Sequence, residues 1–452
     1  MDKIFNDCLY GQIRVPAVCA TIIDTSCFQR LRNIKQLGVG YYVYPSACHN
    51  RFEHCLGVCY LTGQMVEALN KNSPESLFID KQKKICLQIA ALCHDLGHGP
   101  FSHLWEVFVK EANEESLEKA KTESWKHERS SSELLDLIFK EEKVLNALTK
   151  ENLNDEHKQF IKDLILGKRT SSNIVHDGHE FLFEIINNQL NGIDVDKWDY
   201  LSRDGYMMNL KVLFDYRRLL ENARIIKAED DKYHICYRDK VAMNIYLMYR
   251  GRAELHYVGY QHRVVRIIER MLVDALIIAN KNGYTFLGCK LSKAQDNPEV
   301  FAKMTDNILY DILYSSDEML KDAQELLQRI QTRDFYKHVV TCLPENYAVK
   351  EEKDDAEEKV CKKCKDYRNL DLVMVKVEMN IPEELIKNVY IYQKTDLNNA
   401  TLYKHWPNAS VFPLDMKKMK HLQLYIYAKK QLDDATLKNV SKEFLDLFPV
   451  VE

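Results

Sequence analysis

The chain is built around one stretch, Cys93-His94-Asp95-Leu96-Gly97-His98-Gly99-Pro100-Phe101-Ser102-His103. It follows residues 81–92, whose apolar spacing predicts a mostly buried helix. Ionised or strongly polar groups are costly in a protein interior unless they are paired or bind a metal. The adjacent His94 and Asp95 offer a nitrogen and an oxygen, and they therefore predict a site for one divalent cation or two neighbouring cations. The alternative is a satisfied core histidine beside a helix-terminal aspartate.

His98 lies four residues after His94, so it returns to the same face if the helical turn persists. We expect it to lie beside the cation and its ligands without binding the cation itself. The sequence Gly-His-Gly-Pro at 97–100 then ends the helix and lets a ligand approach the backbone closely.

Composition narrows the class of protein. The 452 residues are 46% hydrophobic, with only 15 glycines and 10 prolines, which favours long helices. A net charge of −4 gives no general attraction to nucleic acid, so a polyanion would need a local basic pocket. Thirteen scattered cysteines without a recognisable signal peptide predict an intracellular protein of the nucleus or cytoplasm. No apolar run approaches ~18 residues, so we expect no membrane span.

Two further segments supply partners for the central stretch. Arg51 and His54 are three residues apart and share a helical face, which offers a phosphate-binding cation and a metal ligand. The acid-rich segment 191–204 places Asp196, Tyr200 and Asp204 on one face, with Lys197 beside them, and the alternative for this segment is an N-cap at Asp194 plus surface salt bridges. His127, beside Glu128, is predicted to be a surface histidine unless its segment folds over the site.

Basic residues are interleaved with aromatic residues between 216 and 263, a pattern that suits nucleotides; a solvated face is the alternative for about half of them. A charged helix is expected over 28–37, and its simplest interpretation is an amphipathic surface helix with a solvated polar face. Together with Asp24 it offers groups that can bind a guanine edge and its phosphates. The region before it contains a turn near 6–11 and a helix from Pro16 to Ile23.

The pattern changes near residue 335. The charged run 351–365 contains one CxxC pair, Cys361-Lys-Lys-Cys364, which is weak evidence for zinc, and we expect a solvent-exposed loop there. Residues 372–378, 389–392 and 422–427 are predicted strands, and 433–447 a final helix. The sequence therefore predicts a large helical region followed by a small α+β lobe.

Four runs carry a resemblance to a known family: FQRLRNIKQLG at 28–38, RFEH at 51–54, HDLGHGPFSH at 94–103 and NGIDVDKWDY at 191–200. They resemble the HD-domain dNTP triphosphohydrolases, and most closely the catalytic core of the animal enzymes that also carry a SAM domain. No SAM domain precedes Met1, so we expect a shorter homologue or a trimmed chain. The resemblance implies a mainly α fold, with an HD-domain helical core over 1–335 and a C-terminal α+β lobe, involved in oligomer contacts, over 336–452.

The resemblance also implies roles for individual residues. The divalent metal, Fe, Zn or Mn with additional Mg, would be held by His54, His94, Asp95 and Asp196. The triphosphate, sugar and base of the substrate would be bound by Gln36, Leu37, Arg51, Lys197, Tyr200, Asp204, Arg252, His256, Tyr260 and Gln261. Leu37 and Tyr260 would crowd the 2′ position and exclude ribonucleotides. The groups beside the cleaved phosphorus would be His98, His103, His127 and Glu106. The family usually has an aspartate at the last position, so Glu106 is one methylene longer.

The family binds activating nucleotides at subunit contacts. The residues matching its guanine-selective site are Lys3, Asp24, Gln29 and Arg32. The residues matching its neighbouring dNTP site are Asn6, Arg218, Arg238, Lys240, Asn244, His262 and Arg263. The resemblance thus implies a dNTP triphosphohydrolase that GTP and dNTPs activate by assembling a homotetramer, a dimer of dimers, and that controls dNTP pools.

Two other functions stay open at this point. One is a catalytically weak scaffold that senses nucleotides or binds single-stranded nucleic acid. The other is an HD phosphohydrolase of different chemistry, such as a phosphodiesterase or a nucleotidase. The number of cations near the predicted metal favours a triphosphate over a monophosphate substrate.

Overall fold

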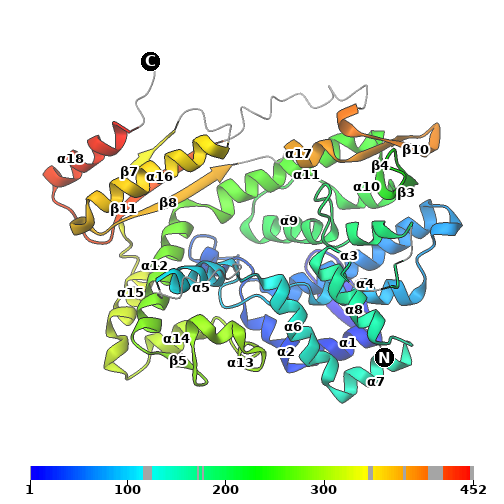
Figure 1. Ribbon diagram of the computed structural model, residues 1–452, viewed down its shortest axis with the longest axis horizontal. Helices are drawn as coiled ribbons and strands as arrows, with labels where there is room; N and C mark the ends of the chain where they lie inside the picture. Colours follow the sequence, from blue (N-terminus) through cyan, green and yellow to red (C-terminus); the bar gives the residue numbers. More distant parts are fainter. Residues whose placement is uncertain are drawn as a thin grey trace. The chain divides into compact units, whose positions relative to one another are not determined.

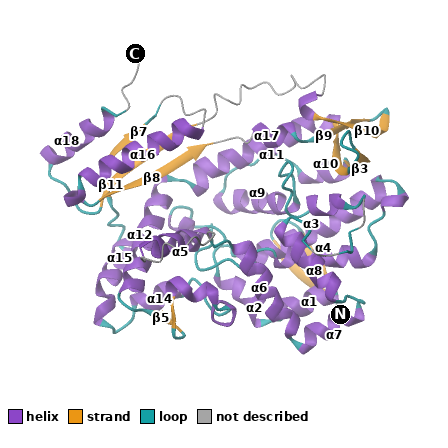
Figure 2. Ribbon diagram, viewed as in Figure 1, coloured by secondary structure: helices purple, strands orange, loops and turns teal. Residues whose placement is uncertain are grey.

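The computed structural model describes residues 2–115, 125–170, 173–175, 178–344, 350–379, 383–405 and 421–447. The chain forms two compact units, each described separately below. Unit 1 comprises Met1–Gly251, Tyr284–Ile308 and Pro382–Pro413, and unit 2 comprises Arg252–Gly283, Leu309–Ile381 and Leu414–Glu452. Helices predominate and the strands form small sheets (Figures 1 and 2), which confirms the predicted mainly α class.

Helices make up most of unit 1. Their bounds are α1 Ala17–Ile23, α2 Ser26–Gln29, α3 Arg51–Asn72, α4 Lys81–Cys93, α5 His103–Glu115, α6 His127–Lys140, α7 Glu142–Lys150, α8 Asp155–Leu166, α9 Val195–Met208, α10 Tyr216–Glu221, α13 Pro298–Phe301 and α17 Glu383–Lys387. Helix α11, Ala242–Glu254, begins in unit 1 and runs into unit 2. The strands of unit 1 are β1 Lys3–Asp7, β2 Gly11–Val15, β3 Ala223–Lys227, β4 Tyr233–Arg238, β5 Thr285–Phe286, β6 Cys289–Lys290, β9 Tyr390–Gln393 and β10 Asp396–Leu402.

The helices that carry the central stretch begin at well-defined caps. The Asp80 side chain accepts a hydrogen bond from the Lys83 N–H at 2.8 Å and starts α4. Glu53 accepts one from the Asn50 N–H at 2.9 Å and starts α3. Helix α4 packs against both α3 and α8 and is almost wholly buried from Ile85 to Cys93. The predicted buried helix is confirmed, and it ends where the polar residues begin.

Strands β3 and β4 form an antiparallel hairpin, which belongs to a four-stranded sheet in the order β10-β9-β4-β3. Strand β9 pairs with β4 in parallel, with Tyr237 opposite Ile391, and all other pairs in this sheet are antiparallel. The segment Pro382–Pro413, which the sequence analysis assigns to the C-terminal lobe, is therefore part of unit 1.

Unit 2 combines helices with one antiparallel sheet of order β7-β11-β8. Its elements are α12 Arg263–Lys281, α14 Ile308–Leu313 (from its second residue), α15 Lys321–Gln331, β7 Lys337–Cys342, α16 Lys350–Asp366, β8 Leu372–Met379, β11 His421–Ala428 and α18 Asp434–Leu445. Val360 of α16 and Phe444 of α18 pack with Leu424 and Ile426 in one core. The strands predicted at 372–378 and 422–427 are confirmed.

Two local predictions are wrong. The charged run 351–365, expected to be an exposed loop, lies within α16, because its apolar residues at Ala356 and Val360 return to one helical face and are buried. The helix expected over 28–37 is only the short α2 followed by a 3-10 helix, Arg30–Asn33. Arg30, expected on a solvated face, is buried at 5% exposure.

Among the described residues, no helix is both long enough and apolar enough to cross a membrane. This agrees with the sequence, which has no long apolar run.

Asp306 ties two distant segments of unit 1 together. Its carboxylate accepts hydrogen bonds from the Lys35 N–H at 2.8 Å and the Phe101 N–H at 2.6 Å. Loss of hydration raises the pKa of Asp306 to about 7, although these two bonds oppose the shift. Its native pKa thus lies above the value near 3.8 of an unperturbed aspartate.

Because unfolded Asp306 ionises before native Asp306, we expect the contribution of this group to the free energy of unfolding to fall as the pH rises from about 4 to about 7. Asp306 changes the free energy of unfolding by at most about 1.4 kcal/mol per pH unit. Urea unfolding of wild type and Asp306→Asn between about pH 5 and pH 8 measures it, since other groups cancel in the difference. Parallel stability curves for the two proteins would contradict the assignment.

Candidate metal centre and active site

Four predicted metal ligands meet in unit 1. His54 lies in the first turn of α3, His94 follows the last residue of α4, Asp95 is next in the chain, and Asp196 lies in the first turn of α9. His54 and Asp95 are almost fully buried, whereas the Asp196 side chain is 27% exposed. The three helix ends thus place two imidazoles and two carboxylates at a point that solvent reaches from one side.

The distances between donor atoms fit a divalent cation. The Nε2 of His54 lies 3.1 Å from an Asp196 oxygen and 3.4 Å from an Asp95 oxygen. The Nε2 of His94 lies 3.3 Å from an oxygen of each aspartate and is buried without a hydrogen-bond partner. Donors bound tetrahedrally at about 2.1 Å stand roughly 3.4 Å apart. These residues therefore fit a borderline transition ion with mixed nitrogen and oxygen ligands.

The second nitrogen of each imidazole is already used. His54 Nδ1 lies 2.8 Å from an Asp199 oxygen, and His94 Nδ1 lies 2.8 Å from the Ala91 carbonyl oxygen. Such contacts fix the tautomer and the ring orientation of a metal-binding histidine. Both Nε2 atoms are thereby directed at the same point.

Asp199, which orients the predicted ligand His54, is itself held by several hydrogen bonds. It accepts hydrogen bonds from Nε and Nη2 of Arg203, both at 2.9 Å, and from the Tyr10 hydroxyl at 2.8 Å. Arg203 also donates to Asp7 at 2.9 Å. Helix α9 approaches α3 so closely here that a Cβ at Gly57 would overlap the Asp199 carboxylate.

The charges of the site are strongly coupled. Burial disfavours the charged imidazole of His54, but the carboxylates of Asp196 and Asp199 outweigh it and raise its pKa to about 10. Burial likewise raises the pKa of Asp95, but the Arg51 guanidinium and neighbouring histidines hold it well below its usual value. Metal binding requires a neutral imidazole, so it displaces the His54 proton.

Arg51 lies directly against the predicted ligands. Its Nη1 donates to Asp95 at 2.6 Å, its Nε donates to the Ser102 hydroxyl at 3.0 Å, and its Nη2 donates to the Gln36 carbonyl oxygen at 3.4 Å. A guanidinium has five N–H donors, so both terminal nitrogens keep one for a further acceptor. Arg51 therefore positions a metal ligand and still presents charge to the site.

A second cluster contains the residues predicted beside the cleaved phosphorus. His98, His103, Glu106 and His127 each offer a donor atom within 4.8 Å of those of the others. His98 Nε2 lies 3.3 Å from Asp95, which links the cluster to the metal ligands. The His127 side chain is only 17% exposed and meets Glu106, so its segment does fold over the site.

Glu106 contacts two histidines of this cluster: His103, which the resemblance leads us to expect, and His127 in addition. Its Oε1 lies 2.7 Å from His127 Nδ1 and 3.5 Å from His103 Nδ1. Although partial burial opposes ionisation, the two imidazoles lower the pKa of Glu106. The longer side chain thus reaches across to the second histidine.

Buried polar side chains hold the loop that carries these groups. Arg30 donates to the Leu96 carbonyl oxygen at 2.9 Å and to the His98 carbonyl oxygen at 2.6 Å. Ser102 donates to the Lys35 carbonyl oxygen at 2.6 Å, and Phe101 donates to Asp306. Phe101 and Ser102 both have a φ of 60°, a left-handed conformation that these bonds keep in place.

Several predicted substrate residues lie in unit 1 near the metal ligands in sequence. Gln36 is buried and its Oε1 has no hydrogen-bond partner, whereas Leu37 is partly exposed. On α9, Lys197 donates to the N-cap residue Asp194 at 2.7 Å, and Tyr200 is partly exposed. Other predicted substrate residues belong to unit 2: Arg252, His256, Tyr260 and Gln261.

Asp204 has an unexpected partner. The buried Nε2 of His49 lies 2.7 Å from its Oδ1. The sequence gives no signal for this pair, because His49 lies in an irregular segment before α3.

The predicted GTP residues form two contacts in unit 1. Lys3 on β1 pairs with Asp24 after α1. Arg32 donates to the Gln29 amide oxygen at 2.7 Å and lies 3.5 Å from the centre of the Phe52 ring. Gln29 also donates to the Ile23 carbonyl oxygen at 2.7 Å, which brings it beside Asp24.

The predicted dNTP residues are distributed over both units. Asn6, Arg218, Arg238, Lys240 and Asn244 lie in unit 1, whereas His262 and Arg263 lie in unit 2. The Asn244 amide exchanges two hydrogen bonds with the backbone of Asp215, at 2.9 and 2.7 Å, so it supports the start of α10.

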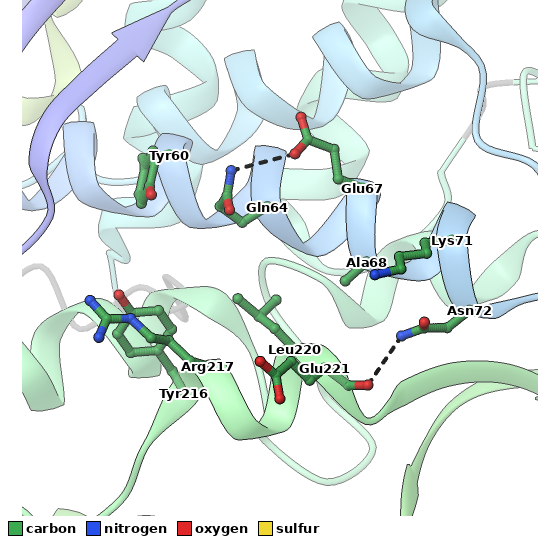
Figure 3. Close-up of a pocket in the computed structure, with 10 residues that line it drawn as sticks. All are labelled: Tyr60, Gln64, Glu67, Ala68, Lys71, Asn72, Tyr216, Arg217, Leu220 and Glu221. Carbon is green, nitrogen blue, oxygen red and sulfur yellow. Dashed lines mark hydrogen bonds between the residues drawn. The ribbon is translucent and has the colours of Figure 1, made fainter.

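A separate groove of about 510 Å³ lies between α3 and α10 (Figure 3). Its wall combines Tyr60 and Gln64 of α3 with Tyr216 and Arg217 of α10. None of its lining residues is a predicted site residue.

Sequence reasoning missed the residues that orient the site: Asp199, Arg203, His49, Arg30 and Asp306. Asp199 and Arg203 lie in the acid-rich segment, and their i, i+4 spacing was a signal that they pair on α9. Arg30 and Asp306 act through contacts far apart in sequence, for which no local pattern exists.

Comparisons with known proteins agree with this geometry. The HD domain profile matches residues 51–204 and the HD associated region matches residues 214–450. The chain is 38% identical over 427 residues to human deoxynucleoside triphosphate triphosphohydrolase SAMHD1, covering 90% of this chain and 66% of the human protein. It is 36% identical to mouse SAMHD1, covering 98% and 71%, and 30% identical to the Dictyostelium discoideum SAMHD1 homolog, covering 93% and 74%. The chain spans about two thirds of the length of its human relative.

Replacing Asp199 with Asn should weaken metal binding about 10–100-fold, because His54 loses the carboxylate that orients it. It should also lower the stability by about 3–5 kcal/mol, since the buried Arg203 loses a charged partner. Isothermal titration with Mn²⁺ and urea unfolding measure the two effects. Asp274→Asn, at a buried aspartate paired with Arg270, is the control that should lose stability only. Unchanged Mn²⁺ affinity in Asp199→Asn would refute the orienting role.

Proposed function

Because this chain belongs to the HD-domain deoxynucleoside triphosphate triphosphohydrolases of the SAMHD1 type, we propose that it hydrolyses dNTPs to a deoxynucleoside and inorganic triphosphate. The reaction breaks the bond between the α-phosphorus and the 5′ oxygen, and water supplies the new oxygen on phosphorus. The single observation that carries the proposal is that the Nε2 atoms of His54 and His94 each lie 3.1–3.4 Å from one oxygen of Asp95 and one oxygen of Asp196.

A divalent cation held by these four residues would supply Lewis-acid activation of water and would neutralise phosphate charge. The protein's own cations support a triphosphate substrate. Arg51 pairs with the predicted ligand Asp95 and has further N–H donors, and Lys197 is 20% exposed on the same helix as Asp196. A nearby Asp194 carboxylate outweighs the effect of burial and raises the pKa of Lys197, so this lysine stays charged.

The second cluster is suited to proton transfer. Burial and the Arg51 charge hold the pKa of His98 well below its usual value, so its imidazole is neutral and can accept a hydrogen bond. His103 is 71% exposed and lies against Glu106, and we assign it the proton that the departing 5′ oxygen requires. Glu106 contacts the imidazoles of both His103 and His127 and helps to position them.

The sugar is the next specificity element. The buried Gln36 Oε1 has no hydrogen-bond partner in the protein, so it can accept a hydrogen bond from the 3′-hydroxyl of the sugar. Asp204 and Tyr200 are proposed to complete that contact. Leu37 and Tyr260 are proposed to crowd the 2′ carbon, so a ribonucleotide should be a poor substrate.

Activation is proposed to involve GTP and dNTPs. A carboxylate at Asp24 accepts from both the N1–H and the N2 amino group of guanine, which adenine does not offer. Lys3 pairs with that carboxylate, and Arg32 donates to Gln29, so two cations that could bind phosphates contact residues of the predicted guanine site. If nucleotides bridge subunits, their binding energy drives assembly and orders the catalytic pocket.

The reaction is tested by its products. With dATP, Mn²⁺, Mg²⁺ and GTP, we expect deoxyadenosine and intact triphosphate in equal amounts on ion-exchange chromatography, and little of either product when GTP is left out. Release of dAMP with pyrophosphate, or of orthophosphate as the first product, would assign the chain to another HD phosphohydrolase chemistry. Absence of any product while dNTP still binds would favour the nucleotide-sensing scaffold.

Replacement of Asp24 with Ala tests activation. The variant should lose both GTP-dependent tetramer formation and GTP-dependent turnover, because the guanine edge loses its acceptor, while Mn²⁺ still binds. Sedimentation velocity beside the product assay measures both. Asp2→Ala, which removes a neighbouring exposed acid near Arg14, is a matched control. Turnover by wild type without GTP, or an Asp24→Ala protein still activated by GTP, would contradict the mechanism.

A further inference from the structure

The cluster of His98, His103, Glu106 and His127 has the composition of a metal site in its own right. It offers three imidazoles and one carboxylate, all within 4.8 Å of one another, and shares no member with the four proposed HD ligands. Imidazole and carboxylate donors in this ratio suit zinc and its neighbours in the first transition row. Protein zinc sites are usually four-coordinate, and four donors are present here.

His98 provides the main evidence for a bound ligand, because one of its ring nitrogens has no partner in the protein. It is 1% exposed, and its Nδ1 is buried without any hydrogen-bond partner. A buried imidazole nitrogen without a partner is destabilising, so such atoms usually have a ligand or a bound group. Its ring stacks on His127 with centroids 3.9 Å apart and lies edge-on to His103 at 4.9 Å. The ring with the unpartnered nitrogen therefore lies against the other two imidazoles, and it would have to turn out of the stack with His127 for both rings to bind one ion.

Glu106 makes the cluster compact. Its Oε1 lies 2.7 Å from His127 Nδ1 and 3.5 Å from His103 Nδ1, so one carboxylate oxygen touches two imidazoles that come from different helices. A carboxylate one methylene shorter would reach less far from α5 toward His127 at the start of α6. The exposed fraction rises from His98 through His127 and Glu106 to His103, which is 71% exposed. An ion can therefore enter from solvent and meet a buried ligand at the inner end.

We propose that His98, His103, Glu106 and His127 form a second transition-metal site, which binds Zn²⁺ next to the proposed HD metal. This assignment rests on the geometry of the cluster and holds whether or not the chain hydrolyses dNTPs. Zn²⁺ there occupies the groups assigned to proton transfer, so it blocks their protonation. Under the proposed function, excess Zn²⁺ therefore inhibits turnover that another divalent cation supports.

The test counts bound zinc. The full chain, stripped with a chelator, is dialysed against buffered Zn²⁺, and zinc per chain is measured by mass spectrometry. The readout is the difference between variants, so that any zinc bound by exposed cysteines, which all variants share, cancels. We expect Glu106→Gln and His103→Gln each to bind one zinc fewer than wild type. Glu128→Gln, which changes a neighbouring acid 3.6 Å from His127, should bind as many as wild type.

A second comparison, made in a variant that lacks one HD-metal ligand, tests the two sites separately. Asp196→Asn removes a proposed ligand of the HD metal only, so the double variant Asp196→Asn/Glu106→Gln should bind one zinc fewer than Asp196→Asn. Glu106→Asp should weaken the second site at least about 10-fold, by shortening the reach to His127. Because His103 is exposed, its replacement leaves the fold intact and keeps the test decisive if Glu106 variants misfold.

Two results would overturn the proposal. One is equal zinc content in wild type and both His103→Gln and Glu106→Gln. The other is equal zinc content in Asp196→Asn with and without Glu106→Gln, which would mean that a single ion is shared. Dialysis with Co²⁺ gives an independent signal, since a four-coordinate site adds visible absorption that Glu106→Gln should lose. Neither readout uses dNTP turnover, so a failure of the proposed function stays distinguishable from a failure of this one.

Discussion

The buried carboxylates of unit 1 must be balanced by positive charge, and the rest of the unit depends on this constraint. Asp95 and Asp199 are at most 3% exposed, and an unpaired buried carboxylate costs several kcal/mol. Positive charge reaches them from separate elements: Arg51 on α3 pairs with Asp95, and Arg203 on α9 pairs with Asp199. His54 lies between the two aspartates. The metal ligands are thus one part of a larger charge network that joins α3, α4 and α9.

The loop after Asp95 meets a second constraint: its backbone N–H and carbonyl groups need hydrogen-bond partners. Residues 96–102 leave helical geometry, and two of them adopt a left-handed conformation that costs about 1–3 kcal/mol each. Side chains from remote segments bind the exposed backbone groups: Arg30 binds two carbonyl oxygens, and Asp306 binds one N–H. His98 is therefore placed by residues that have no part in the chemistry.

Prediction from the sequence succeeded where a local pattern carries the information. Helix α4 and the confirmed strands follow from apolar spacing, and the clustering of the HD residues follows from strings that few families share. Prediction failed where the outcome depends on tertiary contacts. Arg30 looked like a surface residue because its acceptors lie some 66 to 274 positions away. The run 351–365 looked like a loop because charge masks its narrow apolar face.

The parallel pairing of β9 with β4 has a consequence for how the chain is made. Tyr237 meets Ile391 only after more than 150 intervening residues have been synthesised, and this includes most of unit 2. Contacts so distant in sequence slow folding, because loop closure comes before any gain from pairing. Until then β4 presents an open strand edge, which invites pairing with another chain. A nascent or truncated chain that stops before residue 390 is therefore exposed to aggregation through the open edge of β4 in unit 1.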